Sequence, residues 1–345
     1  MAERTFVIAE AGVNHNGSTE LALQLVDVAA RCGADAVKFQ TFSADKLVRR
    51  GAAKAAYQEE TTGAGDQHGM LRELEMSEAL HRLLLERCAA RGIEFMSTPF
   101  DEDAADFLVA LGVRRLKVPS GEITNLPFLR HLVAKDLPLI VSTGMASLEE
   151  IEQAVALIRS ERGRLGLGRP LAEMVCVLHC TSNYPAAVDD VNLRAMQTIA
   201  EATGLPVGYS DHTLGVAVST AAVALGARVI EKHFTVDTSL PGPDHRASLP
   251  PEELERLIAQ IRAVERSLGS DVKQPTASEL PVRALVRRSV TTARELPQGA
   301  VLGRSDICLL RPGTGIEPRD LEAVVGRSLR APLPAGSTLR WEDLE

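Results

Sequence analysis

Two histidines each follow a short apolar run, at the point where a β-strand would end. His212 stands in PVGYSDHTLG, residues 206–215, and His233 stands in VIEKHFTVD, residues 229–237. If the two runs are neighbouring parallel strands, their carboxyl ends place both imidazoles side by side. Two imidazoles can hold a divalent cation and leave coordination positions for water and substrate. The spacing therefore predicts a metal that acts as a Lewis acid on a carbonyl oxygen, although it does not identify the ion.

Two lysines lie inside apolar strand-like runs, Lys38 in DAVKFQ and Lys117 in RLKVPS. A buried ammonium group needs an anionic partner, because desolvation disfavours its charged form. We predict that both lysines help to bind a phosphate or carboxylate, together with hydroxyl groups at other run ends. Those hydroxyl groups belong to Thr98, Ser120, Ser142 and Ser210. The alternative is that the lysines pair with core glutamates such as Glu10 and Glu231.

A carboxylate follows the second lysine closely. Glu122 ends the stretch KVPSGE, so it is well placed to act as a general base on water beside the anion site. The alternative is a solvated loop carboxylate. Lys232, which precedes His233, is left without an assigned role.

Eight strand-like runs alternate with helical stretches over the first 270 residues. The runs are TFVIAE, DAVKFQ, IEFMST, RLKVPS, PLIVST, MVCVLHC, PVGYS and VIEKHF. Between them, stretches such as SLEEIEQAVALIRS carry helix-boundary signals, including Ser147 at a start and Gly33 and Gly92 after an end. This alternation predicts parallel βαβ units, and eight of them predict a (β/α)8 barrel with its active site at the carboxyl ends of the strands. An open doubly wound sheet is disfavoured because no G-x-G-x-x-G follows the first run.

Two further segments depart from this pattern. Residues 43–77 form an unusually long connection, which predicts a lid or a substrate-facing loop, with a tolerated insertion as the alternative. Residues 271–285, DVKQPTASELPVRAL, predict a linker between a barrel domain of residues 1–270 and a small β-rich domain of residues 286–345. The small domain would be marginally stable alone, so we expect it to pack on the barrel or on a second subunit.

Composition excludes several classes of protein. The chain has 345 residues, 45% of them apolar, and a net charge of −8. The negative charge and the lack of a basic run argue against nucleic acid as the main partner. No stretch approaches 18 apolar residues, so we expect a cytosolic protein that does not enter membranes. Five scattered cysteines fit reduced thiols better than a structural zinc site.

A series of motifs, in this order, resembles the sialic acid synthase family, which includes bacterial N-acetylneuraminate synthases and their legionaminic and pseudaminic acid relatives. The motifs are IAEAGVNHNGS, VKFQTF, STPFD, KVPSGEITNLPFL, STGMAS, LHCTSNYP, GYSDHTLG, EKHFT and GPDHRASL. The tail, with RRSV and RPGTGI, resembles the antifreeze-like (SAF) domain of that family. The resemblance covers nearly the whole chain.

The resemblance implies a transferase that condenses phosphoenolpyruvate with an open-chain N-acylated hexosamine, giving a nine-carbon 2-keto acid and phosphate. It implies Mn²⁺, with Mg²⁺ or Co²⁺ as alternatives, and a homodimer that exchanges its SAF domains. N-acetylmannosamine, which gives N-acetylneuraminate, is the acceptor we expect first. The alternative is a 2,4-diacetamido-2,4,6-trideoxyhexose, which gives legionaminic or pseudaminic acid.

The family motifs also imply individual roles. His212 and His233 would hold the metal, and Glu122 would help water to add at C2. The phosphoenolpyruvate site would comprise Lys38, Thr98, Lys117, Ser120, Ser142, Ser182 and Ser210. The acceptor sugar would contact Gln40, Tyr184, Asp244 and Arg311, the last from the SAF domain of the other protomer. Ser182 stands where the neuraminate synthases often have asparagine, and the contact would pass to its hydroxyl group.

Two rival functions remain. A phosphoenolpyruvate-dependent synthase of seven- or eight-carbon keto acids would share the barrel, but such enzymes lack the SAF tail. A carbohydrate-binding or coat-polysaccharide protein without activity would be expected to have lost Glu122, a lysine or a histidine, and this chain keeps all of them.

Overall fold

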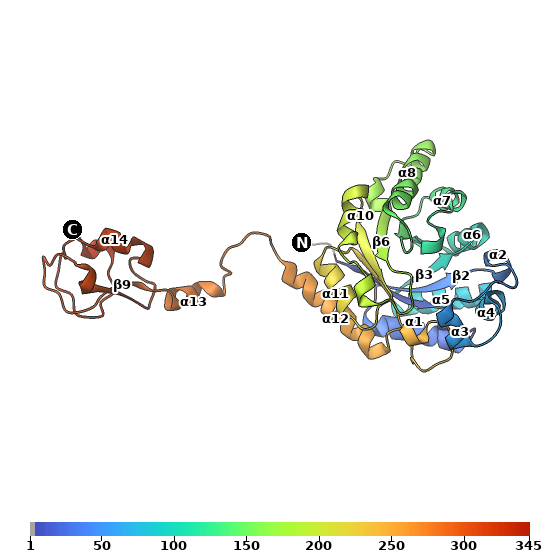
Figure 1. Cartoon of the computed structure of the whole chain (residues 1–345), viewed down its shortest axis with the longest axis horizontal. Helices are drawn as coiled ribbons and strands as arrows, with labels where there is room; N and C mark the ends of the chain where they lie inside the picture. Colours follow the sequence, from blue (N-terminus) through green and yellow to red (C-terminus); the bar gives the residue numbers. More distant parts are fainter. Residues whose placement is uncertain (1–3) are drawn as a thin grey trace. The chain divides into compact units, whose positions relative to one another are not determined.

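The computed structural model describes residues 4–345, which form two compact units that divide between Gly269 and Ser270 (Figure 1). The first unit contains eight parallel strands in the order β3-β2-β1-β8-β7-β6-β5-β4, and β3 lies against β4 to close the barrel. This confirms the predicted (β/α)8 fold. The strands are β1 Phe6–Gly12, β2 Ala36–Thr41, β3 Glu94–Pro99, β4 Leu116–Val118, β5 Leu139–Ser142, β6 Val175–Cys180, β7 Val207–Asp211 and β8 Val229–His233.

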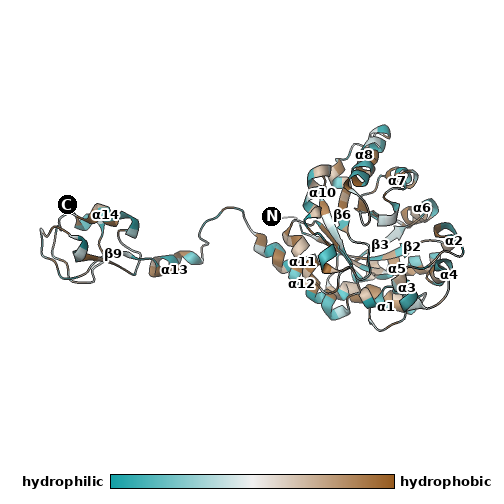
Figure 2. Ribbon diagram, in the orientation of Figure 1, coloured by the Kyte–Doolittle hydropathy of each residue, from teal (hydrophilic) through white to brown (hydrophobic). Residues whose placement is uncertain are grey.

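Amphipathic helices surround the strands, and in Figure 2 they carry both brown apolar residues and teal polar ones. Ser147 caps the helix that follows β5 in a capping box with Glu150, as the sequence predicts. Gly33 and Gly92 end two other helices in the left-handed conformation that glycine adopts most readily. The helices of this layer are α1 Thr19–Cys32, α5 Glu78–Arg91, α6 Glu102–Leu111, α7 Leu126–Val133, α8 Leu148–Arg164, α10 Ala195–Thr203, α11 Ala217–Ala224 and α12 Pro251–Leu268.

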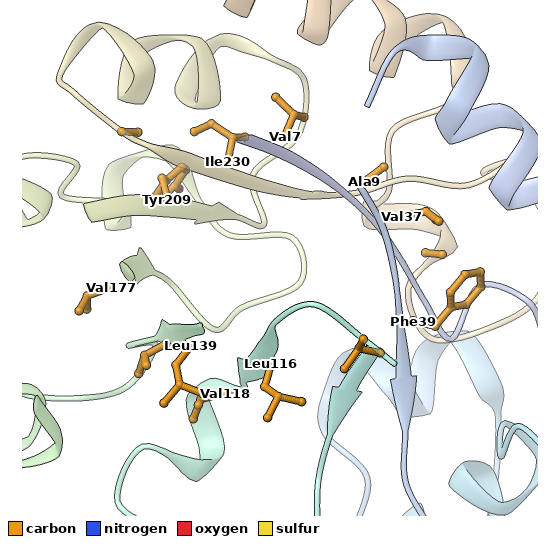
Figure 3. Close-up of a cluster of buried hydrophobic side chains, with 14 of the residues drawn as sticks. Val7, Ala9, Val37, Phe39, Leu116, Val118, Leu139, Val177, Tyr209 and Ile230 are labelled. Atoms are coloured by element: carbon orange, nitrogen blue, oxygen red, sulfur yellow. The ribbon is translucent and has the colours of Figure 1, made fainter. Parts of the chain in front are cut away.

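The two faces of each strand have different neighbours, because successive side chains of a strand point in opposite directions. Side chains such as Val7, Val37 and Tyr209 point toward the helices and form the large apolar core between the two layers (Figure 3). A second, smaller cluster comes from the alternate residues of the same strands and fills the barrel interior. It comprises Ile8, Ala36, Met96, Ile140, Leu178 and Val229.

Gly208 shows how tightly this interior floor is packed. A Cβ atom at this position would lie 2.3 Å from the carbonyl oxygen of Val229 and 2.6 Å from the side chain of Leu178. Only glycine therefore lets β7 approach β8 this closely. The floor seals the lower end of the barrel and leaves the carboxyl ends of the strands for a site.

The long segment of residues 43–77 contains three short helices rather than an irregular loop. They are α2 Ala44–Leu47, α3 Ala56–Thr62 and α4 Gln67–Glu73. Met70 and Leu74 of this segment pack with Val13 and Phe42 in an apolar cluster of their own. This cluster holds the segment against the loops that follow β1 and β2.

The second unit has a small core of its own, built around Val290, Ile307 and Leu339. Its antiparallel strands are β9 Ser289–Thr292 and β10 Ile307–Leu310, and its helices are α13 Glu279–Val286 and α14 Leu321–Val324. The second half of residues 271–285, the stretch predicted to link the two domains, is helical, because α13 begins at Glu279. In the part of the chain that the structure describes, no helix is both long and apolar enough to cross a bilayer.

Candidate active site

A polar layer lies directly above the apolar floor of the barrel. Side chains two positions apart on a strand point the same way, so each floor residue is followed by a second inward-pointing side chain. On six strands that second side chain is polar; for example, Ile8 is followed by Glu10 and Ala36 by Lys38. With Ser210 on the seventh strand, the layer comprises Glu10, Lys38, Thr98, Ser142, Cys180, Ser210 and Glu231. These residues line a cavity of about 480 Å³ at the carboxyl ends of the strands, where a barrel of this kind places its active site.

Most residues that the sequence assigned to the site line this one cavity. They are Lys38, Gln40, Thr98, Lys117, Ser120, Ser142, Ser182, Tyr184, Ser210, His212 and His233. Asp244 is buried just behind the lining, with Oδ2 3.9 Å from Nδ1 of His233. Arg311 is exposed and belongs to the second unit. The structure therefore collects eleven of these side chains into one cavity, from seven strands and their loops.

Glu122, the residue assigned to catalysis, also lies outside the lining. It ends a short 3-10 helix, η1 Ser120–Glu122, and its Oε2 accepts a hydrogen bond of 2.6 Å from Nδ2 of Asn125. In this arrangement it resembles the solvated loop carboxylate that the sequence left as an alternative. Ser120, at the other end of the same turn, accepts a hydrogen bond from the amide of Gly144 and does face the cavity.

Both buried lysines pair with glutamates, which is the alternative that the sequence left open, and they also line the cavity. Lys38 Nζ lies 2.7 Å from Glu10 Oε2 and donates a hydrogen bond of 2.8 Å to Thr98. Lys117 Nζ donates a hydrogen bond of 2.7 Å to Ser142 Oγ. Glu231 lies between the two lysines, 3.6 Å from Lys38 and 3.5 Å from Lys117. We call Glu10, Lys38, Lys117 and Glu231 the pocket network.

The pocket network keeps unused bonding capacity. Oε2 of Glu231 is buried without a hydrogen-bond partner among residues 4–345, whereas Oε2 of Glu10 is paired with Lys38 Nζ. Burial raises the pKa of Glu10 to about 7, against the opposing effect of Lys38. Burial would also raise the pKa of Glu231, but the charges of Lys117 and Lys38 lower it to about 2. When Glu10 is protonated, two ammonium groups face one carboxylate, and the excess positive charge suits an anion.

The two histidines lie together at the rim, with ring centroids 5.5 Å apart. His212 Nδ1 lies 2.6 Å from the carbonyl oxygen of Thr181, which can only accept a hydrogen bond, so Nδ1 carries the proton and Nε2 is free to bind a metal. Nδ1 of His233 is buried and has no hydrogen-bond partner in the described chain. These features fit a cation held by two imidazoles.

The protein supplies few ligands for such a cation. Among residues 4–345, no group of three or more histidine, cysteine, aspartate or glutamate side chains could hold a metal ion. A cation at His212 and His233 would therefore depend on oxygen atoms of substrate and water to complete its coordination. Asp244 is the nearest further carboxylate, and its burial raises its pKa to about 6.

A second buried charge pair lies on the opposite face of β7 and β8. Lys232 Nζ lies 3.0 Å from Asp211 Oδ2 and donates a hydrogen bond to the carbonyl oxygen of Thr213. Asp211 accepts hydrogen bonds from the backbone amide and the hydroxyl of Thr213 and from the hydroxyl of Ser219. We call Asp211, Thr213, Ser219 and Lys232 the outer network. Because Asp211 and Lys232 directly precede the two histidines in sequence, this network anchors the strand ends that carry them.

Sequence reasoning missed several lining residues. The segment of residues 43–77 was predicted to face the substrate, but its contributing side chains, Tyr57, Gln58 and Gln67, were not identified. Cys180 and Met145 also line the cavity. Leu178 points into the barrel, so the two-residue period of a strand could have predicted that Cys180 points inward as well. No local pattern indicates which residues of a long connection turn toward a distant cavity.

The comparisons with known proteins agree with this geometry. Residues 25–273 match the NeuB family, and residues 287–345 match the SAF domain. The chain belongs to the NeuB family. This confirms the resemblance to sialic acid synthases.

Individual NeuB family members resemble nearly the whole chain. The N,N'-diacetyllegionaminic acid synthase of Legionella pneumophila is 55% identical over 99% of this chain and 94% of its own length. The synthase of the same name from Campylobacter jejuni is 42% identical over 94% of this chain and 96% of its own length. The crystal structure of the N-acetylneuraminic acid (sialic acid) synthetase of Leptospira borgpetersenii, in complex with citrate, has a TM-score of 0.71 and 35% identity, and covers 81% of this chain and 90% of that one. Membership therefore supports an enzyme that condenses phosphoenolpyruvate with an amino sugar.

Proposed function

We propose that this protein is a nonulosonic acid synthase in which the pocket network binds phosphoenolpyruvate and the histidine pair binds the aldehyde end of the acceptor. One observation carries the proposal: two buried lysines and two neighbouring imidazoles line the same cavity. Phosphoenolpyruvate brings a carboxylate and a phosphate, which suit the ammonium and hydroxyl donors of Lys38, Lys117 and Ser142. The acceptor brings a carbonyl oxygen, which suits a Lewis acid.

The proposed reaction joins C3 of phosphoenolpyruvate to the aldehyde carbon of the acceptor. Water adds at C2, and the C–O bond to phosphate then breaks, which gives a nine-carbon 2-keto acid and inorganic phosphate. The protein accelerates these steps by holding both reactants in contact and by placing fixed charges around them. Glu122 is the residue that we propose as the general base for this water. Its side chain would have to rotate away from Asn125 to enter the cavity.

Mn²⁺ is the cofactor we propose first, bound to His212 and His233, with Mg²⁺ and Co²⁺ as alternatives. When bound, the ion polarises the acceptor aldehyde. His212→Ala should lose Mn²⁺ binding in isothermal titration calorimetry and should lose phosphate release. Full activity in thoroughly chelated enzyme would contradict the role of a metal.

A sugar with two acetamido groups is the acceptor that we propose first. Phosphoenolpyruvate contributes three carbons and no nitrogen, so a diacetyl product requires a hexose that already carries both acetamido groups. The 55% and 42% identity to two synthases of N,N'-diacetyllegionaminic acid supports this acceptor over N-acetylmannosamine, which we expected first from sequence. N-acetylmannosamine becomes the second candidate, supported by the 35% identity to an N-acetylneuraminic acid synthetase.

We further propose a homodimer, because α13 has no buried residue although it carries large apolar side chains. Leu280 is 51% exposed and Leu285 is 68% exposed, and such a face usually marks an interface. Exchange of SAF domains would bring Arg311 to the acceptor of the other subunit. Leu285→Glu should shift the mass measured by light scattering from dimer to monomer, and a wild-type monomer would contradict the proposal.

Phosphate release tests the proposed function directly. Purified enzyme with phosphoenolpyruvate and Mn²⁺ should release phosphate when 2,4-diacetamido-2,4,6-trideoxymannose or N-acetylmannosamine is added, and chelation should stop the release. Release with neither acceptor would contradict the synthase assignment.

A further inference from the structure

Helix α3 contributes a part of the cavity that has a different character from the pocket network. Tyr57 and Gln58 lie on the first turn of α3, are half-buried, and line the cavity. The backbone amide of Ala55 donates a hydrogen bond of 3.0 Å to Gln58 Oε1, and Gln58 Nε2 lies 3.4 Å from the hydroxyl oxygen of Tyr57. These contacts give the two side chains a preset conformation before any ligand binds.

A series of aromatic rings connects α3 to the histidine pair. The ring of Tyr184 lies 4.1 Å from that of His212 and 5.6 Å from that of His233. The ring of Tyr184 also lies 5.4 Å from the ring of Tyr57, at an interplanar angle of 31°. The cavity therefore extends from the imidazoles, past Tyr184, to α3.

This series sets the order in which an extended acceptor meets the protein. If the aldehyde carbon lies at the histidine pair, the middle of the sugar chain passes Tyr184, and the carbons farthest from the aldehyde reach Tyr57 and Gln58. Tyr57 and Gln58 carry no charge. Burial raises the pKa of Tyr57 to about 12, so its phenol keeps its proton at neutral pH.

The chemistry of these two side chains matches an acetamido substituent. A tyrosine ring offers an apolar face to the acetyl methyl group, and its hydroxyl can donate or accept a hydrogen bond. A glutamine side chain is itself an amide and can pair with another amide through both its oxygen and its nitrogen. A hydroxyl at the same carbon would reach neither the ring face nor both amide atoms.

We infer that Tyr57 and Gln58 are specificity-determining residues that recognise the acetamido group on the distal half of the acceptor, so that the enzyme selects a sugar with two acetamido groups over one with a single acetamido group. This inference rests on the proposed synthase function and assigns the choice of acceptor to α3. Neither residue takes part in the binding of phosphoenolpyruvate or in the chemical steps.

The test compares two acceptors in four variants. The values of kcat/KM for 2,4-diacetamido-2,4,6-trideoxymannose and for N-acetylmannosamine are measured in Tyr57→Ala, Tyr57→Phe, Gln58→Ala and the control Glu60→Ala. Glu60 lies on the same helix and is exposed, so its substitution leaves the cavity intact. The KM for phosphoenolpyruvate and the melting temperature are recorded for each variant, because a distorted cavity or a damaged fold would change them.

We expect wild-type enzyme and Glu60→Ala to prefer the diacetamido sugar. In Tyr57→Ala and Gln58→Ala this preference should fall at least about tenfold, as expected for lost contacts to one substituent, with KM for phosphoenolpyruvate unchanged. Tyr57→Phe should keep the part of the preference that the ring provides and lose the part due to the hydroxyl.

Three results would overturn the inference. Equal loss toward both acceptors in Tyr57→Ala would show a general effect on the cavity. An unchanged preference in both alanine variants would show that selection occurs elsewhere, while the synthase function would stand. Wild-type enzyme that turns over neither acceptor would overturn the inference together with the proposed function.

Discussion

The pocket network and the outer network are two sets of buried charges, one inside the barrel and one on its outer face. They differ in how completely their hydrogen-bonding groups are paired. In the outer network, Asp211 accepts three hydrogen bonds in addition to its ion pair with Lys232. In the pocket network, Oε2 of Glu231 is buried without a hydrogen-bond partner in the described residues, and the nearest ammonium groups, those of Lys38 and Lys117, lie 3.6 Å and 3.5 Å from the carboxylate. Buried polar groups are normally satisfied, so the incomplete network indicates where a ligand completes it.

The comparison also separates stability from activity. A fully satisfied buried pair contributes to the fold mainly because removal of one partner leaves the other charge uncompensated. An incompletely satisfied pair costs stability, and such cost is typical of sites that bind charged ligands. We therefore expect substitutions in the two networks to have opposite profiles, and four predictions test this difference.

The largest effect should come from removal of a complete charge pair from the pocket network. Above pH 7, where Glu10 is ionised, Lys38→Met combined with Glu10→Gln takes away one ammonium group and one carboxylate at constant net charge. Phosphate release should fall by roughly 10³-fold or more, because the fixed charge that faces the substrate is lost. The free energy of unfolding, measured with urea, should change by less than about 1 kcal/mol, since replacement of a buried pair as a unit is often neutral. Retained activity would remove the distinction between the networks.

The next largest effect should come from Asp211→Ala in the outer network. This change leaves Lys232 buried without a carboxylate and deprives Thr213 and Ser219 of their acceptor. We expect a loss of about 3–5 kcal/mol in the free energy of unfolding, with weaker Mn²⁺ binding because the adjacent histidines lose their anchor. A variant as stable as wild type would show that the outer network does not support the fold.

A smaller effect should appear in the pH dependence of stability. The pKa of Glu10 is raised in the folded protein, so its contribution to stability is fully present below pH 4.5 and is lost as the pH rises through about 7. The shift from 4.5 to about 7 corresponds to about 3 kcal/mol at most. Urea titrations between pH 5 and pH 8 should show that Glu10→Gln lacks this decline.

Glu231 does not obscure that measurement. Its pKa is lowered, so its stabilising contribution is present above pH 4.5 and is lost only as the pH falls toward about 2. The two windows are separate. A Glu10→Gln variant with the same decline as wild type between pH 5 and pH 8 would contradict the raised pKa of Glu10.

The smallest effect should come from an exposed ion pair outside both networks. Arg256 NH2 lies 2.9 Å from Glu253 on the surface of α12, and the side chain of Arg256 is 55% exposed. Arg256→Ala should lower the free energy of unfolding by less than about 0.5 kcal/mol and leave phosphate release unchanged, because solvent screens the pair. A larger change would mean that burial does not account for the difference between the networks.

The sequence predicted the inward-facing half of this site well. Eight strand-like runs that alternate with helical stretches were sufficient to predict a barrel and to place Lys38, Lys117, His212 and His233 at one end of it. These positions depend on strand geometry, which has a strict two-residue period and is therefore readable from local sequence.

The rest of the site depends on contacts that local sequence does not encode. The sequence assigned no role to Lys232, and only the structure shows that Asp211 and Lys232 lie on the face opposite the cavity and pair with each other. Tyr57 reaches the cavity only because the segment of residues 43–77 packs through Met70 and Leu74 against other loops. The orientation of Glu122 is set by a single hydrogen bond to Asn125.

A crystal structure of the protein with Mn²⁺ and phosphoenolpyruvate would test the central claim most directly. The account predicts an anomalous scattering peak between the imidazoles of His212 and His233, and a phosphoenolpyruvate molecule whose anionic groups contact Lys38 and Lys117. A metal bound away from both histidines would contradict the account. So would an anion bound outside the cavity, with Lys38 and Lys117 still paired only with Glu10 and Glu231.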